Sequence, residues 1–147
     1  MPLEGEYIPS TAGWVRDQVQ AYEASGGREA NTLRDTGLPI VIVTNRGNRS
    51  GSLRKTPLMR VEHDGEYALV ASKGGAPQHP VWYYNLVADP EIMIQDGPEP
   101  FDAVVRQVGG DEREAWWERA VAAFPPYAEY AAKTDREIPV FVASRRA

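Results

Sequence analysis

The stretch Leu58-Met-Arg-Val-Glu-His-Asp-Gly-Glu-Tyr-Ala-Leu-Val-Ala-Ser72 decides the fold class of this 147-residue chain. At its centre, Asp64-Gly65 separates two segments rich in apolar residues, and this dipeptide is a strong signal for a two-residue β-hairpin turn. We therefore expect antiparallel strands over Leu58–His63 and Glu66–Ser72. Upstream, the β-branched run Ile40-Val-Ile-Val-Thr44 predicts one more strand, followed by a basic loop. This half of the chain is predicted to be a β-meander.

The remaining elements are predicted on both sides of this meander. Apolar residues at helical spacing, followed by helix terminators, predict helices over residues 12–25, 81–88 and 111–124. Asp111 and Glu114 resemble a capping box that opens the last of these helices. Further strands are expected at Glu91–Gln95, Phe101–Val108 and Ile138–Ala143.

These elements predict a small β-barrel with peripheral helices, mainly β within the α+β class. The roughly six strands lie too close together in the chain for βαβ crossovers, so the sheet should be mostly antiparallel and closed or nearly closed. We expect a single domain over residues 1–147, with the N-terminal helix at 12–25. The chain ends, residues 1–11 among them, are the candidates for disorder.

The composition excludes several kinds of chemistry. Without cysteine, the chain forms no disulfide and offers no thiolate nucleophile or zinc–sulfur site. Only His63 and His79 remain as soft metal ligands, and each is interpreted as an exposed polar residue, so no metal is expected. No apolar run approaches the length of a membrane span, and the N-terminal Met-Pro-Leu-Glu-Gly-Glu lacks the features of a secretory signal. A cytoplasmic protein is expected.

A basic segment indicates an anionic ligand. Between positions 45 and 61 there is no acidic residue, although the net charge of the chain is -5. The basic residues of this segment are Arg46, Arg49, Arg54, Lys55 and Arg60. Guanidinium groups match phosphate oxygens, and a glycine-punctuated turn can expose backbone N–H donors, so a phosphorylated ligand is the first hypothesis. A solvated hairpin is the structural alternative, and nucleic acid is a third reading that the acidic remainder of the chain disfavours.

Two further segments could carry function. Ser72-Lys73-Gly74-Gly75 combines a hydroxyl, a cation and closely approachable backbone at the end of a strand, although an ordinary loop would look the same. The aromatic run Trp82-Tyr83-Tyr84 suits a flat ligand or core packing. Tyr127 and Tyr130 share one side of a helical turn, where they form either a hydrophobic cluster or a pair of phenols that orient an acceptor. No Gly-x-Gly-x-x-Gly fingerprint follows a strand, so a Rossmann domain is not supported.

Taken in order, these segments resemble the deazaflavin-dependent nitroreductase and quinone reductase family. The matching motifs are Gly47-x-Arg49-Ser50-Gly51-x-x-Arg54-x-x-Pro57-Leu58, Asp64-Gly65, Ala71-Ser-Lys-Gly-Gly-Ala76, Pro80-x-Trp82-Tyr83-x-Asn85-Leu86, Pro126-Tyr127-x-x-Tyr130 and Thr134-Asp135-Arg136-x-Ile138-Pro139. The match extends from the strand at Ile40 to the C-terminus. The resemblance implies a split β-barrel related to flavin-mononucleotide oxidases, with the reduced deazaflavin coenzyme F420 as hydride donor.

The resemblance also implies a role for each segment. The phosphate and oligoglutamate part of the coenzyme would be held by Asn48, Arg49, Ser50, Arg54 and Lys55. The deazaflavin ring would be lined by Thr56, Pro57, Leu58 and Met59 and by Val70, Ala71, Ser72 and Lys73. The segment that closes over the coenzyme would be Val81, Trp82, Tyr83, Tyr84 and Asn85. Tyr127 and Tyr130 would border the acceptor, with Ser72 in polar contact with the acceptor or the ring and Tyr127 placed to deliver a proton.

We therefore predict a reductase that transfers a hydride from reduced F420 to an electron-poor acceptor such as a quinone, an enone or a nitro compound. The rival predictions are a flavin-mononucleotide (FMN) dependent oxidase or reductase of the same barrel type, and a deazaflavin-binding protein without turnover. Nitro-reducing members tend to carry tyrosines where this chain has Met59 and Phe124, which disfavours nitroimidazole reduction. The small-molecule acceptor is the expected partner, without nucleic acid or metal, and homodimerisation and peripheral membrane association stay open.

Overall fold

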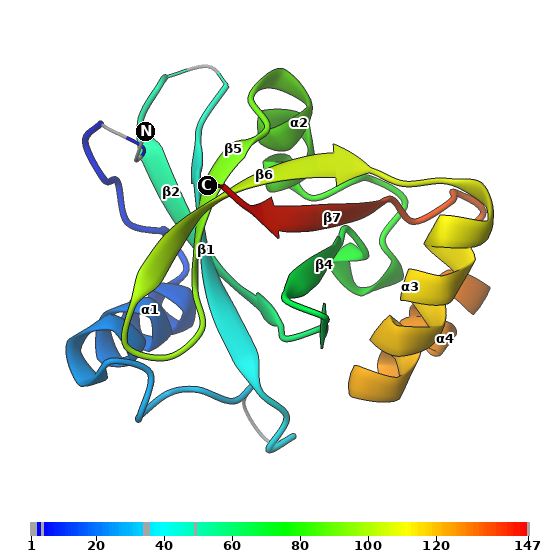
Figure 1. Cartoon of the computed structure of the whole chain (residues 1–147), viewed down its shortest axis with the longest axis horizontal. Helices are drawn as coiled ribbons and strands as arrows, with labels where there is room; N and C mark the ends of the chain where they lie inside the picture. The colour runs from blue at the N-terminus through cyan, green and yellow to red at the C-terminus, as the bar shows by residue number, and fades with distance from the viewer. Residues whose placement is uncertain (1–2, 4, 34–35, 49, 147) are drawn as a thin grey trace.

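The computed structural model describes residues 3, 5–33, 36–48 and 50–146 and is dominated by one curled antiparallel sheet (Figure 1). The strands are β1 (Ile40–Arg46), β2 (Leu53–Met59), β3 (Glu62–His63), β4 (Glu66–Val70), β5 (Glu91–Gln95), β6 (Pro100–Gln107) and β7 (Val140–Arg145). The helices are α1 (Gly13–Ser25), α2 (Val81–Ala88), α3 (Gly110–Ala123) and α4 (Pro126–Ala132), with a 3₁₀ turn, η1, at Lys73–Gly75. This architecture confirms the predicted barrel-type fold class.

The sheet curls because its two edge strands are neighbours in the chain. The strand order is β2-β1-β5-β6-β7-β4-β3, and every pairing in it is antiparallel. If the sheet were flat, β2 and β3 would lie about 29 Å apart. The link from Met59 to Glu62 can span only about 11 Å. The two edges must therefore approach each other, and the sheet encloses an interior.

Much of the predicted basic loop belongs to the sheet, which corrects the sequence prediction. The N–H of Leu53 donates to the carbonyl of Glu6 at 2.8 Å, and the carbonyl of Leu53 accepts from the N–H of Ile8 at 3.0 Å. Backbone groups of residues 53, 55 and 57 therefore point away from β1. Pro57 has no N–H, but its backbone nitrogen lies on this outer side. The proline therefore removes no hydrogen bond between β2 and β1. Residues 6–8, in a segment considered a candidate for disorder, pair with the outer edge of β2.

Two predicted boundaries were also wrong. The expected strand Leu58–His63 is divided at Arg60-Val61, because there the chain passes from one sheet edge to the other and the N–H of Arg60 donates to the carbonyl of Pro39 at 3.0 Å. Helix α3 begins at Gly110 without a side-chain cap, so Asp111 lies inside the first turn and does not form the predicted capping box. In the first turn its carboxylate still interacts favourably with the helix dipole.

Alternate residues of β1 enter two separate cores. Ile40 and Ile42 pack with side chains of α1, α3 and α4, and we call this cluster the helix-side core. Val41 and Val43 pack with residues of β4, β5, β6 and β7 and with Leu86 of α2, and we call this cluster the inner core. Helices α3 and α4 lie side by side at one end of the molecule, and α1 lies at the other end beside β2 (Figure 1). Odd-numbered residues of β1 therefore face the barrel interior.

The loop after β4 packs closely against α4. Gly75 has a φ of +80°, and a Cβ atom at this position would lie 2.8 Å from the carbonyl oxygen of Tyr130. Gly74 has a φ of +62°, but a Cβ atom there would meet nothing within 4 Å. Both glycines permit the turn, and only Gly75 also permits the close approach to α4.

Gly75→Ala should lower the free energy of unfolding by roughly 2–4 kcal/mol, because left-handed backbone strain adds to an overlap with α4. Gly74→Ala is the matched control. It introduces the same kind of strain without the overlap, so it should cost only about 1–2 kcal/mol. Urea unfolding followed by tryptophan fluorescence measures both values, and equal losses would contradict the close packing of this loop.

Candidate functional site

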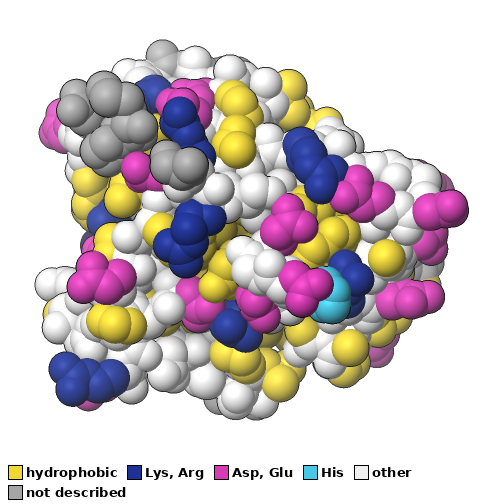
Figure 2. Space-filling view, in the orientation of Figure 1, with side chains coloured by type: hydrophobic (Ala, Val, Ile, Leu, Met, Phe, Trp, Pro, Cys, Tyr) yellow, Lys and Arg dark blue, Asp and Glu magenta, His cyan; other side chains and the backbone are white. Residues whose placement is uncertain are grey.

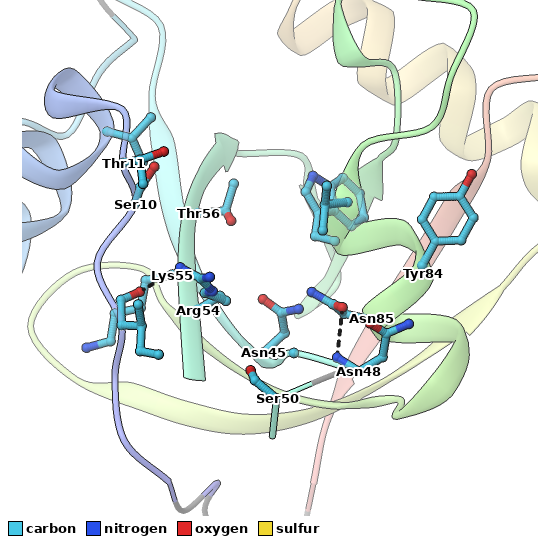
Figure 3. Close-up of a pocket in the computed structure, with 15 residues that line it drawn as sticks. Ser10, Thr11, Asn45, Asn48, Ser50, Arg54, Lys55, Thr56, Tyr84 and Asn85 are labelled. Atoms are coloured by element: carbon cyan, nitrogen blue, oxygen red, sulfur yellow. Dashed lines mark hydrogen bonds between the residues drawn. The ribbon is translucent and has the colours of Figure 1, made fainter. Parts of the chain in front are cut away.

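A cleft of about 880 Å³ opens at the mouth of the barrel. One wall is the N-terminal segment with Ile8, Ser10 and Thr11, the floor is the β1–β2 hairpin, and the opposite wall is α2 (Figure 3). In the register of the hairpin, Asn45 pairs with Arg54, so both side chains lie on the inner-core face of the sheet. The curl of the sheet thus brings three distant parts of the chain around one concave surface.

About half of the residues that the sequence predicted as coenzyme ligands line the cleft. Those that line it are Asn48, Ser50, Arg54, Lys55, Thr56, Val81, Trp82, Tyr84 and Asn85. The predicted residues that lie outside its lining are Pro57, Leu58, Met59, Val70, Ala71, Ser72, Lys73, Tyr83, Tyr127 and Tyr130. Arg49 is outside the described residues. Met59 and Val70 belong to the helix-side core, on the other face of the sheet.

Most of the described basic side chains of this segment are neutralised by carboxylates from distant parts of the sequence. Ion pairs join Arg46 to Asp89 at 2.6 Å, Lys55 to Glu23 at 2.5 Å and Arg60 to Asp96 at 2.9 Å. On the face seen in Figure 2, basic side chains are interspersed with acidic ones. The net positive charge around this segment in the folded protein is therefore much smaller than the sequence of the segment alone indicated.

Arg54 differs from these three cations. Its guanidinium donates to the carbonyl oxygens of Ile8 at 3.2 Å and Pro9 at 3.5 Å, and it has no carboxylate partner among the described residues. Its side chain is exposed and borders the cleft. Arg54 is thus the described cation best placed to meet an anionic ligand.

The turn between β1 and β2 uses many of its backbone donors internally. The N–H of Gly47 donates to the Ser52 carbonyl at 2.8 Å, and that of Gly51 donates to the Gly47 carbonyl at 3.0 Å. The N–H of Asn48 donates at 3.0 Å to Oδ1 of Asn85, which is buried on α2 (Figure 3). The predicted cradle of exposed N–H groups is therefore reduced, and side chains supply most of the donors at this end of the cleft.

Sequence reasoning missed Asn45 on the floor of the cleft and the N-terminal residues Ser10 and Thr11. Asn45 lines the cleft with a side chain that is only 1% exposed, and neither its Oδ1 nor its Nδ2 has a hydrogen-bond partner among the described residues. The available signal was a carboxamide that directly follows the β-branched run from Ile40 to Thr44. Ser10 and Thr11 were missed because their segment was a candidate for disorder.

Arg136 holds the loop that carries Ser72 and Lys73. Its guanidinium donates to the carbonyls of Ser72 at 2.6 Å, Ala76 at 2.8 Å and Ala71 at 3.2 Å. It also approaches Nδ1 of His79 at 3.0 Å, and because a guanidinium has no acceptor, this nitrogen must be the unprotonated one. Burial, and secondarily the charge of Arg136, lower the pKa of His79.

The two candidate acceptor tyrosines lie on α4. Tyr127 is 5% exposed within the helix-side core, where its ring meets that of Phe124 at a centroid distance of 4.9 Å. Burial, with a smaller contribution from Tyr130, raises the pKa of Tyr127, so its phenol stays protonated at neutral pH. Tyr130 is only partly buried, and its ring lies 6.2 Å from that of Tyr127.

The described part of the chain offers neither a metal-binding cluster nor a membrane-spanning helix. It contains no group of three or more His, Cys, Asp or Glu side chains arranged to hold a metal ion. It also contains no helix with the length and apolar character needed to cross a membrane.

Comparison with known proteins gives consistent matches. The sequence model of a family described as F420H(2)-dependent quinone reductase matches residues 14–145. An F420H(2)-dependent quinone reductase of Mycobacterium tuberculosis is 31% identical over 128 residues, covering 85% of each chain. A solved F420-H2 dependent reductase is 55% identical with a TM-score of 0.69, covering 72% of this chain and 94% of that one. A solved domain-swapped dimer is 48% identical with a TM-score of 0.72, covering 92% and 100%.

Arg136→Met should raise the pKa of His79, because it removes a like charge from beside the imidazole, and should reduce hydrogen-exchange protection in residues 72–76. Arg136→Lys is the matched control, because it keeps the positive charge but loses the forked hydrogen-bond donors of the guanidinium. Hydrogen-exchange protection of residues 72–76 should then fall while the pKa of His79 stays low. NMR titration of His79 measures the pKa.

In the native protein, the low pKa of His79 makes protonation favour unfolding. Stability should therefore decline as the pH falls through the ordinary value of 6.5 toward the pKa of the folded state. A His79 pKa that does not respond to Arg136→Met would contradict this contact.

Proposed function

The chain belongs to the F420H(2)-dependent quinone reductase family, and we propose that it transfers a hydride from reduced coenzyme F420 to a quinone, with enones and nitro compounds as further acceptors. The observation that carries this proposal is the cleft itself. It combines Arg54, a cation that has no carboxylate partner among the described residues, with the aromatic side chains of α2. A ligand with an anionic tail and a flat ring matches both features.

The described residues fit this coenzyme. Arg54 and the Ser50 hydroxyl can bind phosphate or carboxylate oxygens at the hairpin end of the cleft. Trp82, which packs against the inner core, offers an aromatic surface at the α2 end. The buried, unpartnered carboxamide of Asn45 on the floor is a further sign that the fold leaves room for a polar ligand.

When bound, the reduced coenzyme supplies the hydride, and the protein is left to bind, orient and shelter the reactants. Asn85 accepts a hydrogen bond from the β1–β2 turn, so the α2 wall is fixed relative to the floor of the cleft. Catalysis in this proposal is mostly positioning.

Ser72, Tyr127 and Tyr130 are the proposed groups on the acceptor side. Arg136 binds the carbonyl of Ser72, and Gly75 packs against the backbone of Tyr130 on α4, the helix that also carries Tyr127. A phenol whose pKa is raised remains a hydrogen-bond donor at neutral pH, which supports an orienting role for Tyr127 toward an acceptor oxygen. The domain-swapped dimer among the solved relatives supports a homodimer for this chain as well.

Purified protein should bind F420 saturably and oxidise the reduced coenzyme in the presence of a short-chain quinone. Fluorescence titration measures binding, and recovery of the fluorescence of the oxidised deazaflavin measures turnover. Tight binding without turnover of a quinone, enone or nitro panel would favour a non-catalytic binding protein. A yellow protein that releases FMN on denaturation would favour the FMN-dependent rival.

Tyr127→Phe should reduce kcat by about tenfold or more while leaving the Kd for F420 nearly unchanged, because it removes one hydroxyl directed to the acceptor. Tyr130→Phe, on the same helix, gives the comparison for the more exposed phenol. Since burial raises the pKa of Tyr127 above its usual 10, the rate should not fall through ionisation of this phenol near pH 10. An unchanged kcat would remove Tyr127 from the acceptor site.

A further inference from the structure

Asn45 is a polar side chain at a position where the fold requires none. It is the last inward-facing residue of β1, following Val41 and Val43, which belong to the inner core. Its backbone is paired on both sides, with Arg54 of β2 and Ile92 of β5. Its carboxamide has no hydrogen-bond partner among the described residues, and that group points into the cleft between β2 and α2 (Figure 3).

The described part of the protein satisfies neither polar atom of the Asn45 carboxamide. The residue is 1% exposed, and both Oδ1 and Nδ2 lack partners among the described residues. Exchanging the two atoms by a flip of the amide leaves one donor and one acceptor unpartnered again. An apolar side chain of similar size would fit the end of the inner core better. The asparagine is therefore explained by a ligand rather than by the fold.

The ligand group that satisfies Asn45 must both donate and accept. Phosphate and carboxylate oxygens only accept, so they would leave Oδ1 without a donor. The face of an aromatic ring offers neither function. The pyrimidinedione edge of the deazaflavin carries an N–H beside carbonyl groups, but Asn45 lies opposite Arg54, the cation proposed for the anionic part, which favours a group nearer the phosphate. A hydroxyl offers both, and the chain that joins the deazaflavin ring of F420 to its phosphate is a sugar alcohol with several hydroxyls. Arg54, opposite Asn45 on β2, is the cation proposed for the adjoining anionic part.

We propose that Asn45 is a specificity-determining residue that binds the hydroxylated linker of the coenzyme, between its ring and its phosphate. This assignment rests on the proposed use of F420. Asn45 adds a neutral carboxamide, which can both donate and accept hydrogen bonds, to a site whose other proposed contacts are charged or aromatic. It also explains why a buried strand of the inner core ends in a carboxamide.

The test compares three ligands by fluorescence titration: F420, the deazaflavin–ribityl fragment without phosphate or glutamates, and the N10-methyl deazaflavin ring alone. Asn45→Leu should raise the Kd by about tenfold for the first two and leave the ring alone unaffected. Arg54→Ala should weaken F420 only, because the two smaller ligands carry no phosphate. Thr44→Val, at a buried polar residue on the opposite face of β1, is the matched control and should change none of the three.

A second measurement does not depend on the coenzyme. Asn45→Leu should raise the thermal midpoint of the ligand-free protein, because it removes a buried group without partners, and should lower the additional stabilisation by the ribityl fragment. A lower midpoint, or an unchanged Kd for F420 in Asn45→Leu, would overturn the assignment, and an equal loss with the ring alone would assign Asn45 to the ring instead. Failure of the unsubstituted protein to bind F420 would reject the proposed function itself.

Discussion

The short link between β2 and β3 is the constraint on which the rest of the structure depends. Two residues, Arg60 and Val61, join strands at opposite ends of the sheet order, so the sheet must close on itself. The curled sheet encloses an interior, which the side chains of the inner core fill. The mouth of this interior is left open to a ligand. The cleft lies at this mouth because α2 and the N-terminal segment stand on either side of the β1–β2 hairpin.

Charge at the cleft is set by tertiary contacts rather than by the local sequence. The carboxylates of Glu23, Asp89 and Asp96 come from α1, from the end of α2 and from the β5–β6 connection, and each pairs with a cation of the basic segment. These partly exposed pairs contribute little to stability. Their larger effect is to fix the edges of the hairpin and to cancel charge there. Recognition of an anion then depends on fewer groups, of which Arg54 is the clearest.

Local signals predicted the features that depend on local physics. The Asp64-Gly65 turn and the end of the N-terminal helix at residue 25 both occur as predicted, because Asp64, Gly65 and Gly26 adopt the positive φ angles that these residue types favour. The segment pattern also sufficed for the fold class and the family. Contacts between distant segments were not predictable in the same way. The predicted capping box does not form because the N-cap of α3 is Gly109, two residues before Asp111, and the spacing of Asp111 and Glu114 does not encode that earlier start. Asn45 was missed because its burial follows from the curl of the whole sheet.

Two proposed coenzyme ligands and a proposed acceptor residue lie on opposite faces of the sheet. Asn45 and Arg54 face the inner core, whereas Tyr127 belongs to the helix-side core, so no single strand carries both groups. The loop from Ala71 to Gly75 leaves β4 and reaches α4, where it packs against the backbone of Tyr130. Arg136 binds three carbonyls of this loop and so fixes its course. In the proposed arrangement, with the ring in the cleft and the acceptor near α4, Arg136 would act by holding this loop in position, since it lies outside the lining of the cleft.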